Sequence, residues 1–335
     1  MRVSRAPIWK TRQKDRGWRC FWSPTADMEL QIGKQKLRIK DYYCADGDGI
    51  YLPREDAKLW LYVHLTDACN ASCPFCVNAG DRRKSGAGTI SLRGLEECLV
   101  SLSDRIGGVS ITGGEPMLYP ELTDKAAQLV MDILPDAMLD LATNGTNLER
   151  IPQLQSLDAF EGIHVSRHSP DDETNDRIFG RRMPSAEEIR RLLLQMSDPA
   201  KIVFNCVMQK GLVDSEEAVA SYLEAAAAAG VRNTSFIGMF RANAYCREKY
   251  VSPALLELKD PRFHIWNHFR DHDYCACSSG SYDAAAGPVR FYYRCPGSGK
   301  APFTRQLVYT ADDRLLAGFG GIEIRRQNKG WEDHS

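Results

Sequence analysis

The sequence predicts an α/β fold built on a parallel sheet. Six short apolar runs of strand length alternate with amphipathic stretches of helical length between residue 60 and about residue 240. Repeated strand–helix units place their strands side by side in one direction, with the helices outside. Ligands of such sheets bind at the carboxyl ends of the strands. The runs lie at 60–65, 107–112, 138–142, 162–166, 201–207 and 233–238.

Helix-start and helix-stop signals fall between these runs. Ser91 is placed to cap a helix over 92–103. Ser185-x-x-Glu188 is a capping-box pattern for a helix over 186–196. Asp214-x-x-Glu217 begins a third helix, which runs through the alanine-rich stretch 225–229 and stops at Gly230. The alternation of strand and helix therefore has local support.

Composition limits the classes of function. The chain has 335 residues, of which 43% are hydrophobic and 26% charged, with a formal net charge of −1. These values are ordinary for a globular protein, and so small a charge gives no field that attracts nucleic acid or a membrane surface. The sequence shows neither an apolar run of membrane-spanning length nor an apolar signal core at its start. We therefore expect a cytoplasmic protein with no nucleic-acid or membrane partner.

Segments flank the strand–helix region on both sides. We expect an N-terminal extension over 1–57, the strand–helix domain over 58–240, and a C-terminal extension over 241–335. The first contains an alternating stretch at 28–39 that predicts a small hairpin, which would cap the main domain. Its basic, tryptophan-bearing arm at 1–22 either grips a peptide or anionic substrate or is a solvated tail, as most short charge runs are.

Three cysteines occupy the loop after the first predicted strand. Cys69, Cys73 and Cys76 have the spacing Cys-x3-Cys-x2-Cys, which lets them converge on one metal centre without long loop closure. Three ligands on a four-iron cluster leave one iron for a ligand that is not protein. The alternatives are a zinc site and unrelated free thiols. The eleven cysteines fall mainly at 69–76 and 275–295, a grouping that indicates metal or redox chemistry.

The following strand ends carry glycine-rich or polar motifs. Thr112-Gly-Gly-Glu-Pro116 comes after the second strand, where glycines permit close backbone approach to a ligand and Glu115 offers an anionic acceptor for an ammonium group. The later strand ends contribute Thr143-Asn144-Gly, Ser166-Arg167-His168, Asn205 and the segment around Ile237.

Together, the cysteine loop and these motifs resemble the radical S-adenosylmethionine (SAM) superfamily over about residues 58–240. Phe75 fits as well, since an aromatic residue usually precedes the third cysteine of that family. The resemblance implies a partial (βα)6 TIM-like barrel with parallel strands, with an N-terminal cap and a C-terminal auxiliary-cluster extension. It also implies that a 4Fe–4S cluster binds SAM and cleaves it, with one electron, to methionine and a 5′-deoxyadenosyl radical.

The same resemblance implies the SAM contacts. The Gly-Gly-Glu-Pro motif would contact the SAM amino group, and Thr-Asn-Gly would line the pocket. Ser166 and Arg167 would reach the carboxylate or ribose, Arg167 as a bidentate fork. Asn205 would contact SAM, and Ile237 would lie near the adenine. The implied cofactor-binding set is Phe75, Gly113, Gly114, Glu115, Pro116, Thr143, Asn144, Ser166, Arg167, Asn205 and Ile237.

Two further residues are candidates for direct roles at the substrate. His168 either faces the substrate or is a satisfied structural histidine. Cys246 either donates a hydrogen atom to a substrate radical, as a lone thiol does in radical SAM peptide epimerases, or packs as a buried thiol.

Cys275, Cys277 and Cys295 form the second cysteine group, near a predicted strand at 289–295 and a predicted hairpin at 305–316. The group resembles the extensions that hold a second, auxiliary 4Fe–4S cluster. It departs from both known patterns: the Cys-x2-Cys-x5-Cys-x3-Cys run of the peptide enzymes is absent, and the cyclase Cys-x2-Cys is here Cys-x-Cys. Three alternatives apply to this group. A fourth ligand could come from Cys20, Cys44 or Cys246, one iron could lack a protein ligand, or the cysteines could be structural or bind zinc.

The motif order is closest to the subgroup that contains the GTP cyclase of molybdopterin biosynthesis and the peptide-modifying enzymes. We expect cross-linking or epimerisation of a ribosomally made peptide. One alternative is a radical SAM enzyme that acts on a nucleotide or sugar. A second alternative, from another class of protein, is a zinc-binding regulatory protein. Either enzyme would need a one-electron reductant of the flavodoxin or ferredoxin type.

Overall fold

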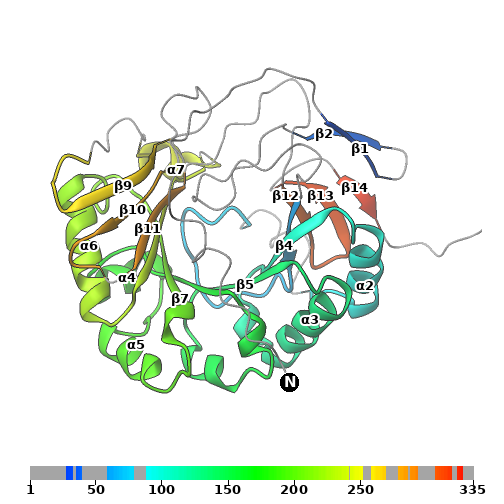
Figure 1. Ribbon diagram of the computed structural model, residues 1–335, viewed down its shortest axis with the longest axis horizontal. Coiled ribbons are helices and arrows are strands. Elements are labelled where there is room, and N and C mark those ends of the chain that lie inside the picture. The colour runs from blue at the N-terminus through cyan, green and yellow to red at the C-terminus, as the bar shows by residue number, and fades with distance from the viewer. Residues whose placement is uncertain are drawn as a thin grey trace, which may run out of the picture.

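The computed structural model describes residues 28–32, 35–39, 59–78, 88–240, 242–251, 258–268, 278–285, 287–292, 306–318 and 323–326. Its main feature is a 12-stranded sheet in the order β14-β13-β12-β3-β4-β5-β6-β7-β8-β11-β10-β9. The six predicted strands are all present and parallel: β3 (Leu59–His64), β4 (Ile106–Thr112), β5 (Met138–Thr143), β6 (Gly162–Ser166), β7 (Ile202–Val207) and β8 (Asn233–Ile237). The sheet curves into an open arc, which confirms the α/β partial-barrel prediction (Figure 1).

Helices connect these strands and lie outside the arc (Figure 1). The capping box of Ser185 and Glu188 is present, and Ser91 accepts a hydrogen bond from the N–H of Gly94. The last helix of the series starts one residue later than predicted, because Ser215 rather than Asp214 is its N-cap. The helices are α2 (Leu92–Ser101), α3 (Pro120–Ile133), α4 (Asp172–Phe179), α5 (Ala186–Leu193) and α6 (Glu216–Ala228).

Short 3-10 turns complete the connections. They are η3 (Pro116–Leu118), η4 (Leu148–Gln153), η5 (Leu157–Ala159) and η6 (Pro199–Lys201). None of these turns was predicted, since turns of three to six residues leave little periodicity to detect.

Side chains on the parallel strands alternate between two environments. Outward-facing residues such as Leu61, Val109 and Leu141 have no exposed surface and pack beneath the helices. Inside the arc, the Trp60 ring covers Gly108, where an added Cβ would lie 2.3 Å from the ring, and the indole N–H donates to Ser110 Oγ at 2.8 Å. The β3–β4 side of the lumen is therefore filled by an aromatic ring.

The segments after residue 240 extend this sheet at both edges. β11 (Pro288–Tyr292) pairs in parallel with β8, and β12 (Gln306–Tyr309) pairs in parallel with β3. Antiparallel strands follow outside them: β10 (Ser278–Tyr282) and β9 (Phe263–His268) beyond β11, and β13 (Arg314–Ala317) and β14 (Glu323–Arg326) beyond β12. The predicted β11 strand and the β12–β13 hairpin are confirmed over their described residues. The domain boundary expected at 240 is thus crossed by continuous sheet hydrogen bonding.

The predicted N-terminal hairpin is also confirmed, as β1 (Met28–Ile32) paired antiparallel with β2 (Gln35–Ile39). Among the described residues, no helix has both the length and the apolar character needed to span a membrane. The basic arm at 1–22 and five of the cysteines that entered the predictions lie outside the described residues. Those cysteines are Cys20, Cys44, Cys275, Cys277 and Cys295.

Candidate active site

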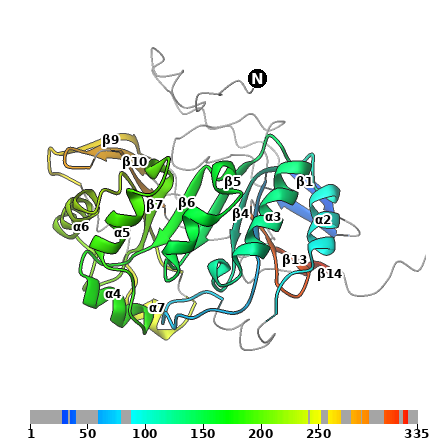
Figure 2. The same cartoon turned by 90° about the horizontal axis from the view of Figure 1, so that it is seen from below.

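The three-cysteine loop begins directly after β3, at the carboxyl end of the parallel strands. Thr66 shapes its start: the Thr66 hydroxyl donates to the Gly88 carbonyl at 2.9 Å and accepts from the N–H of Ala68 at 3.0 Å. Cys69, Cys73 and Cys76 are half-buried. In Figure 2 the pale-blue trace of this loop lies at the same end of the molecule as α4 and α7 (Ala244–Glu248). The structure therefore places the loop where the sequence predicted chemistry.

The Gly-Gly-Glu turn after β4 packs against the backbone of this loop. The N–H of Gly114 donates to the Thr66 carbonyl at 2.7 Å, and the N–H of Glu115 donates to the Ala68 carbonyl at 2.8 Å. A Cβ at Gly114 would lie 2.0 Å from the Ala68 oxygen, and Gly113 has a φ of +130°. Glycine is required here because the backbone of the turn lies close to the backbone of the cysteine loop. From the sequence we expect the close neighbour to be a ligand.

Glu115 is fully buried beneath this turn. Its Oε1 accepts from the Thr143 hydroxyl at 2.6 Å and from the N–H of Met117 at 2.9 Å, and its Oε2 accepts from the N–H of Asn144 at 2.5 Å. Burial raises the pKa of Glu115 to about 7, although these hydrogen bonds oppose the rise. Protein donors occupy both oxygens, so Glu115 joins the ends of β4 and β5 and presents no open carboxylate to a ligand.

The Thr-Asn-Gly segment after β5 reaches the first cysteine. The Asn144 side-chain amide donates to Asn70 Oδ1 at 2.9 Å and lies 3.9 Å from the Cys69 sulfur. Thr146 joins the same group, since the Asn70 amide donates to its hydroxyl at 2.9 Å. Sequence reasoning missed Asn70, whose only signal was its position directly after Cys69. These side chains fix the first cysteine against β5.

The end of α4 braces the other side of the loop. The N–H of Ser72 donates to the Phe179 carbonyl at 2.9 Å, and the Arg181 guanidinium donates to the Asn70 carbonyl at 3.0 Å. Gly180, with a φ of +68°, ends the helix in the left-handed conformation typical of a helix C-terminus. The contact between this helix end and the cysteine loop was not predicted from the sequence. Its signal was a glycine directly after the apolar pair Ile178-Phe179.

His168 lies between two aromatic rings beside the loop. Its ring stacks on Phe179, with centroids 5.0 Å apart, and meets the edge of Phe75 at 4.9 Å. The N–H of Val207 donates to His168 Nδ1 at 3.1 Å, which places the ring proton on Nε2. Burial lowers the pKa of His168 to about 3, so the ring is neutral. Of the two interpretations in the sequence analysis, this geometry matches the satisfied structural histidine.

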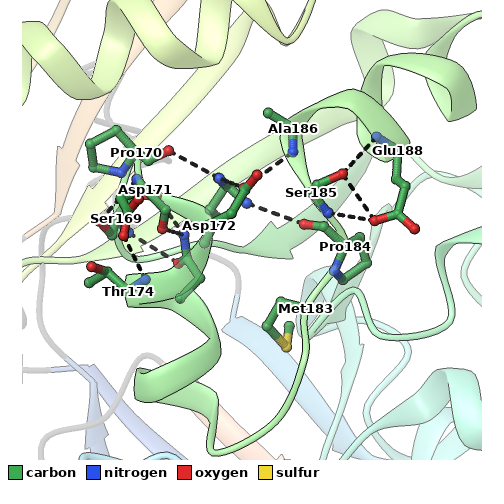
Figure 3. Close-up of polar contacts among 12 residues, drawn as sticks. Ser169, Pro170, Asp171, Asp172, Thr174, Met183, Pro184, Ser185, Ala186 and Glu188 are labelled. Carbon is green, nitrogen blue, oxygen red and sulfur yellow. Dashed lines mark hydrogen bonds and ion pairs between the residues drawn. The ribbon is translucent and has the colours of Figure 1, made fainter.

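Arg167 is buried, with 6% of its side chain exposed. Its guanidinium donates to the carbonyls of Pro170 at 3.1 Å and Pro184 at 3.3 Å and pairs with the Asp172 carboxylate. Asp172 also accepts from the N–H of Ala186 at 3.2 Å (Figure 3). The Arg167 fork is therefore directed at the chain itself, where it ties the start of α4 to the start of α5, and a contact with the SAM carboxylate stays a prediction.

The remaining implied SAM contacts lie at strand ends inside the arc. Ser166, Asn205 and Ile237 are half-buried; Ser166 is beside Asn205 in the sheet register, and Ile237 is beside Val207. A small recess opens between the ends of β5 and β6 and the helices α4 and α5, lined in part by Asn144, Ser166 and Phe179. The structure brings these predicted residues together at one end of the barrel.

Cys246 lies behind the segment that joins the second and third cysteines. It has no exposed surface, and its sulfur is 3.9 Å from the Phe75 carbonyl oxygen. Asn243 caps α7 by accepting from the N–H of Cys246 at 2.8 Å, and its amide donates to the Pro74 carbonyl at 2.9 Å. Cys246 thus packs against the backbone of the cysteine loop at Phe75. A role as hydrogen-atom donor stays a prediction.

The residues present fit a four-iron cluster, since three half-buried cysteines share one short loop. A cubane cluster takes each cysteine on a different iron, so its three sulfurs do not meet at one point. The amide of Asn144 beside the Cys69 sulfur suits a cluster ligand, because cluster sulfurs accept such hydrogen bonds.

Comparisons with known proteins agree with this geometry. Residues 63–223 match the family described as the radical SAM superfamily. The chain is 28% identical over 194 residues to the GTP 3′,8-cyclase of Aliarcobacter butzleri, covering 55% of this chain and 57% of the relative. It is 30% identical over 161 residues to the probable GTP 3′,8-cyclase of Thermococcus kodakarensis, covering 47% and 50%. The chain spans about half the length of these curated relatives.

Two of the solved structures to which the chain is similar contain AdoMet. BtrN in complex with AdoMet and 2-DOIA is 24% identical, with 44% of this chain and 56% of that chain covered and a TM-score of 0.34. Native anSMEcpe with bound AdoMet is 18% identical, with 59% and 57% covered and a TM-score of 0.43. The family match itself covers the cysteine loop, the Gly-Gly-Glu turn and most of the strands that carry them, so this part of the chain is a radical SAM domain.

Proposed function

We propose that Cys69, Cys73 and Cys76 hold a 4Fe–4S cluster and that SAM binds beside it, at the carboxyl ends of β6, β7 and β8. The chemistry supplied there, when both groups are bound, is one-electron cleavage of SAM to a radical that takes a hydrogen atom from the substrate. The observation that carries the proposal is the bracing of the cysteine loop by Gly114, Asn144 and α4.

The chain's own residues then have distinct tasks. Glu115 and Thr143 hold the loop's supports in place, and the Asn144 amide beside the Cys69 sulfur favours the reduced state of a cluster bound there. Ser166, Asn205 and Ile237 are positioned to orient SAM. His168, Phe75 and Phe179 form an apolar wall beside the second cysteine, Cys73.

Two substrate classes are candidates for the overall reaction. From the motif order we expect a ribosomally made peptide, and the alternative is a nucleotide or sugar. The names of the curated relatives, GTP 3′,8-cyclases, support the alternative. A second cluster on Cys275, Cys277 and Cys295 and a flavodoxin- or ferredoxin-type reductant belong to this proposal as well.

A triple alanine variant of Cys69, Cys73 and Cys76 tests the cluster assignment. After anaerobic reconstitution, the variant should lose about four iron atoms per chain and should form no 5′-deoxyadenosine with dithionite and SAM. The matched control is Cys98→Ala with Cys206→Ala, which removes two cysteines that are buried in the core, on α2 and β7. A triple variant that still forms 5′-deoxyadenosine refutes the proposal.

Total iron addresses the second cluster, and deuterium transfer addresses the substrate. Two clusters require about eight iron atoms per chain in the wild-type protein, whereas one requires about four. Deuterated GTP and a deuterated precursor-type peptide are supplied separately, and deuterium in the recovered 5′-deoxyadenosine identifies the molecule that lost the hydrogen atom.

A further inference from the structure

A set of polar side chains lies inside the arc of strands, beside the proposed SAM contacts and below them. The set, which we call the lumen row, comprises Asp140 of β5, His164 of β6, Asn205 of β7, Ser235 of β8 and Arg290 of β11. Their inward direction follows from their neighbours, which are buried on the outer face. Phe236 stacks on Phe291 with centroids 5.1 Å apart, so Ser235 and Arg290, one residue earlier on each strand, face the lumen.

Three members of the lumen row form a connected chain. His164 Nε2 lies 3.4 Å from Asp140 Oδ2, and His164 Nδ1 lies 3.2 Å from Asn205 Oδ1. Gly162 makes room for the pair, because a Cβ there would lie 3.1 Å from His164 Nε2 and 3.2 Å from Asp140 Oδ1. The histidine side chain is 26% exposed and the aspartate 15%. These groups are therefore held in place yet still accessible to a small molecule.

The other two members, Ser235 and Arg290, supply hydrogen-bond donors from β8 and β11. Ser235 is 1% exposed, and its hydroxyl has no hydrogen-bond partner. Arg290 stands beside Ser235 in the register of β8 and β11 and is half-buried. Within the described part of the chain, no ion pair neutralises Arg290. A buried unpaired hydroxyl beside a guanidinium is costly unless a ligand satisfies both, and an anion does so.

The lumen row extends from the level of the proposed SAM contacts to deeper positions in the barrel. Ser235 and Arg290 are level with Asn205 and Ser166 in the sheet register. His164 precedes the strand-end Ser166 by two residues, which places it about 7 Å further along the strand. Only Asn205 belongs to both groups. The lumen row is thus placed to meet a second molecule that lies beside and beneath SAM in the barrel.

We propose that the lumen row binds a small sugar-like substrate that carries hydroxyl groups and one anionic group, either phosphate or carboxylate. The inference rests on the proposed function, since it names the molecule from which the hydrogen atom is taken. Arg290 and Ser235 donate to the anion, and the His164–Asp140 pair with Asn205 bonds the hydroxyls. A ribosomal peptide, whose backbone and side chains rarely combine dense hydroxyls with an anion, fits this surface less well.

Titration calorimetry on the full-length, anaerobically reconstituted enzyme with SAM tests the site. The probes are ribose 5-phosphate, glucuronate, neutral ribose and the neutral peptide acetyl-Ser-Gly-Ser-amide. One or both anionic sugars should bind, with ribose about tenfold weaker or more, and the peptide should not bind. Whether the phosphate or the carboxylate binds more tightly identifies the anion.

Variants locate the binding within the lumen row. Arg290→Gln should weaken the anionic sugar about tenfold or more, while leaving ribose unaffected. His164→Asn should weaken all three sugars. The matched control is Arg93→Gln, on the exposed face of α2, which should change nothing. A thermal melt of each variant confirms that it is folded.

Two results overturn the inference: neither anionic sugar binds the wild-type enzyme, or Arg290→Gln binds the anionic sugar as tightly as the wild type does. Peptide binding that depends on Arg290 would also overturn it, in favour of a peptide substrate. Formation of 5′-deoxyadenosine by the wild type, measured in the same preparation without any probe, reports separately on the proposed function. An enzyme that cleaves SAM but binds no anionic sugar loses this inference alone.

Discussion

The N–H of Asn144 donates to the Glu115 carboxylate at 2.5 Å, across 29 positions in the sequence. This bond joins the two loops that support the cysteine segment: the Gly-Gly-Glu turn after β4 and the Thr-Asn-Gly segment after β5. Since Asn144 also contacts Cys69 and Asn70, Glu115 acts on the cluster site through its neighbours and is a positioning residue.

Glu115→Gln should destabilise the protein by about 1–3 kcal/mol and lower iron incorporation, because the new amide turns a donor toward N–H groups that need an acceptor. Urea unfolding and iron content after reconstitution provide the measurements. Glu96→Gln, on the exposed side of α2, is the matched control and should change neither stability nor iron content. Equal stability and iron content in both variants would show that Glu115 does not hold the loops.

The same residue should give stability a defined pH dependence. The pKa of Glu115 is raised from 4.5 to about 7 on folding, so the folded state binds the extra proton. The contribution of this shift to the free energy of unfolding is fully present below about pH 4.5 and is lost as pH rises through 7. The loss is about 3 kcal/mol at most. The free energy of unfolding of the cluster-free wild type, minus that of Glu115→Gln, should fall across this window. A flat difference contradicts the prediction.

His168 should produce a slope of the opposite sign. Burial lowers its pKa from 6.5 to about 3, so the folded state resists the proton that the unfolded chain accepts. Stability from neutral His168 is present above about pH 6.5 and is lost as pH falls toward 3, by about 1.4 kcal/mol per pH unit. His168→Asn, which keeps an acceptor for the N–H of Val207, should remove that slope in urea unfolding from pH 6.5 to 4.5. Parallel curves for the two proteins would show that the ring titrates freely.

Gly113→Ala should prevent cluster assembly. The new Cβ would lie 2.7 Å from the Thr66 carbonyl, a backbone atom that cannot move without shifting the cysteine loop. Gly211→Ala is the matched control, because Gly211 also has a positive φ, of +84°, but has no atom within 4 Å of an added Cβ. The control should cost about 1 kcal/mol in stability and leave iron content unchanged. Similar iron loss in both variants would mean that backbone strain, and not the clash, is responsible.

Arg167→Lys should destabilise the protein by about 2–4 kcal/mol, since an ammonium cannot reach all three of the acceptors that the guanidinium serves. Arg191→Lys, at an exposed ion pair on α5, is the control and should cost less than about 1 kcal/mol. Calorimetric SAM affinity of the folded Arg167→Lys protein should stay close to that of the wild type. A large loss of affinity without loss of stability would return Arg167 to the SAM carboxylate.

Much of the fold was predictable because its signals are local. The apolar runs that became β3 to β8 each lie within one or two residues of the observed strand bounds. Ser91 and the Ser185–Glu188 capping box are read directly from a few consecutive residues. The helix that starts after Ser215 was shifted by one position, since Asp and Ser are both good caps and only the structure shows which side chain accepts the bond.

Local signals specify the order of strands and helices and the three cysteines at the end of the first strand, because periodicity, capping and close spacing involve neighbours along the chain. The tertiary structure alone decided that Arg167 bonds to Asp172, that Glu115 is enclosed, and that strands after residue 240 join both edges of the sheet. Hydrogen-bond partners and burial depend on distances between residues far apart in sequence. The lumen row, drawn from five strands, exists only once those strands curve around one interior.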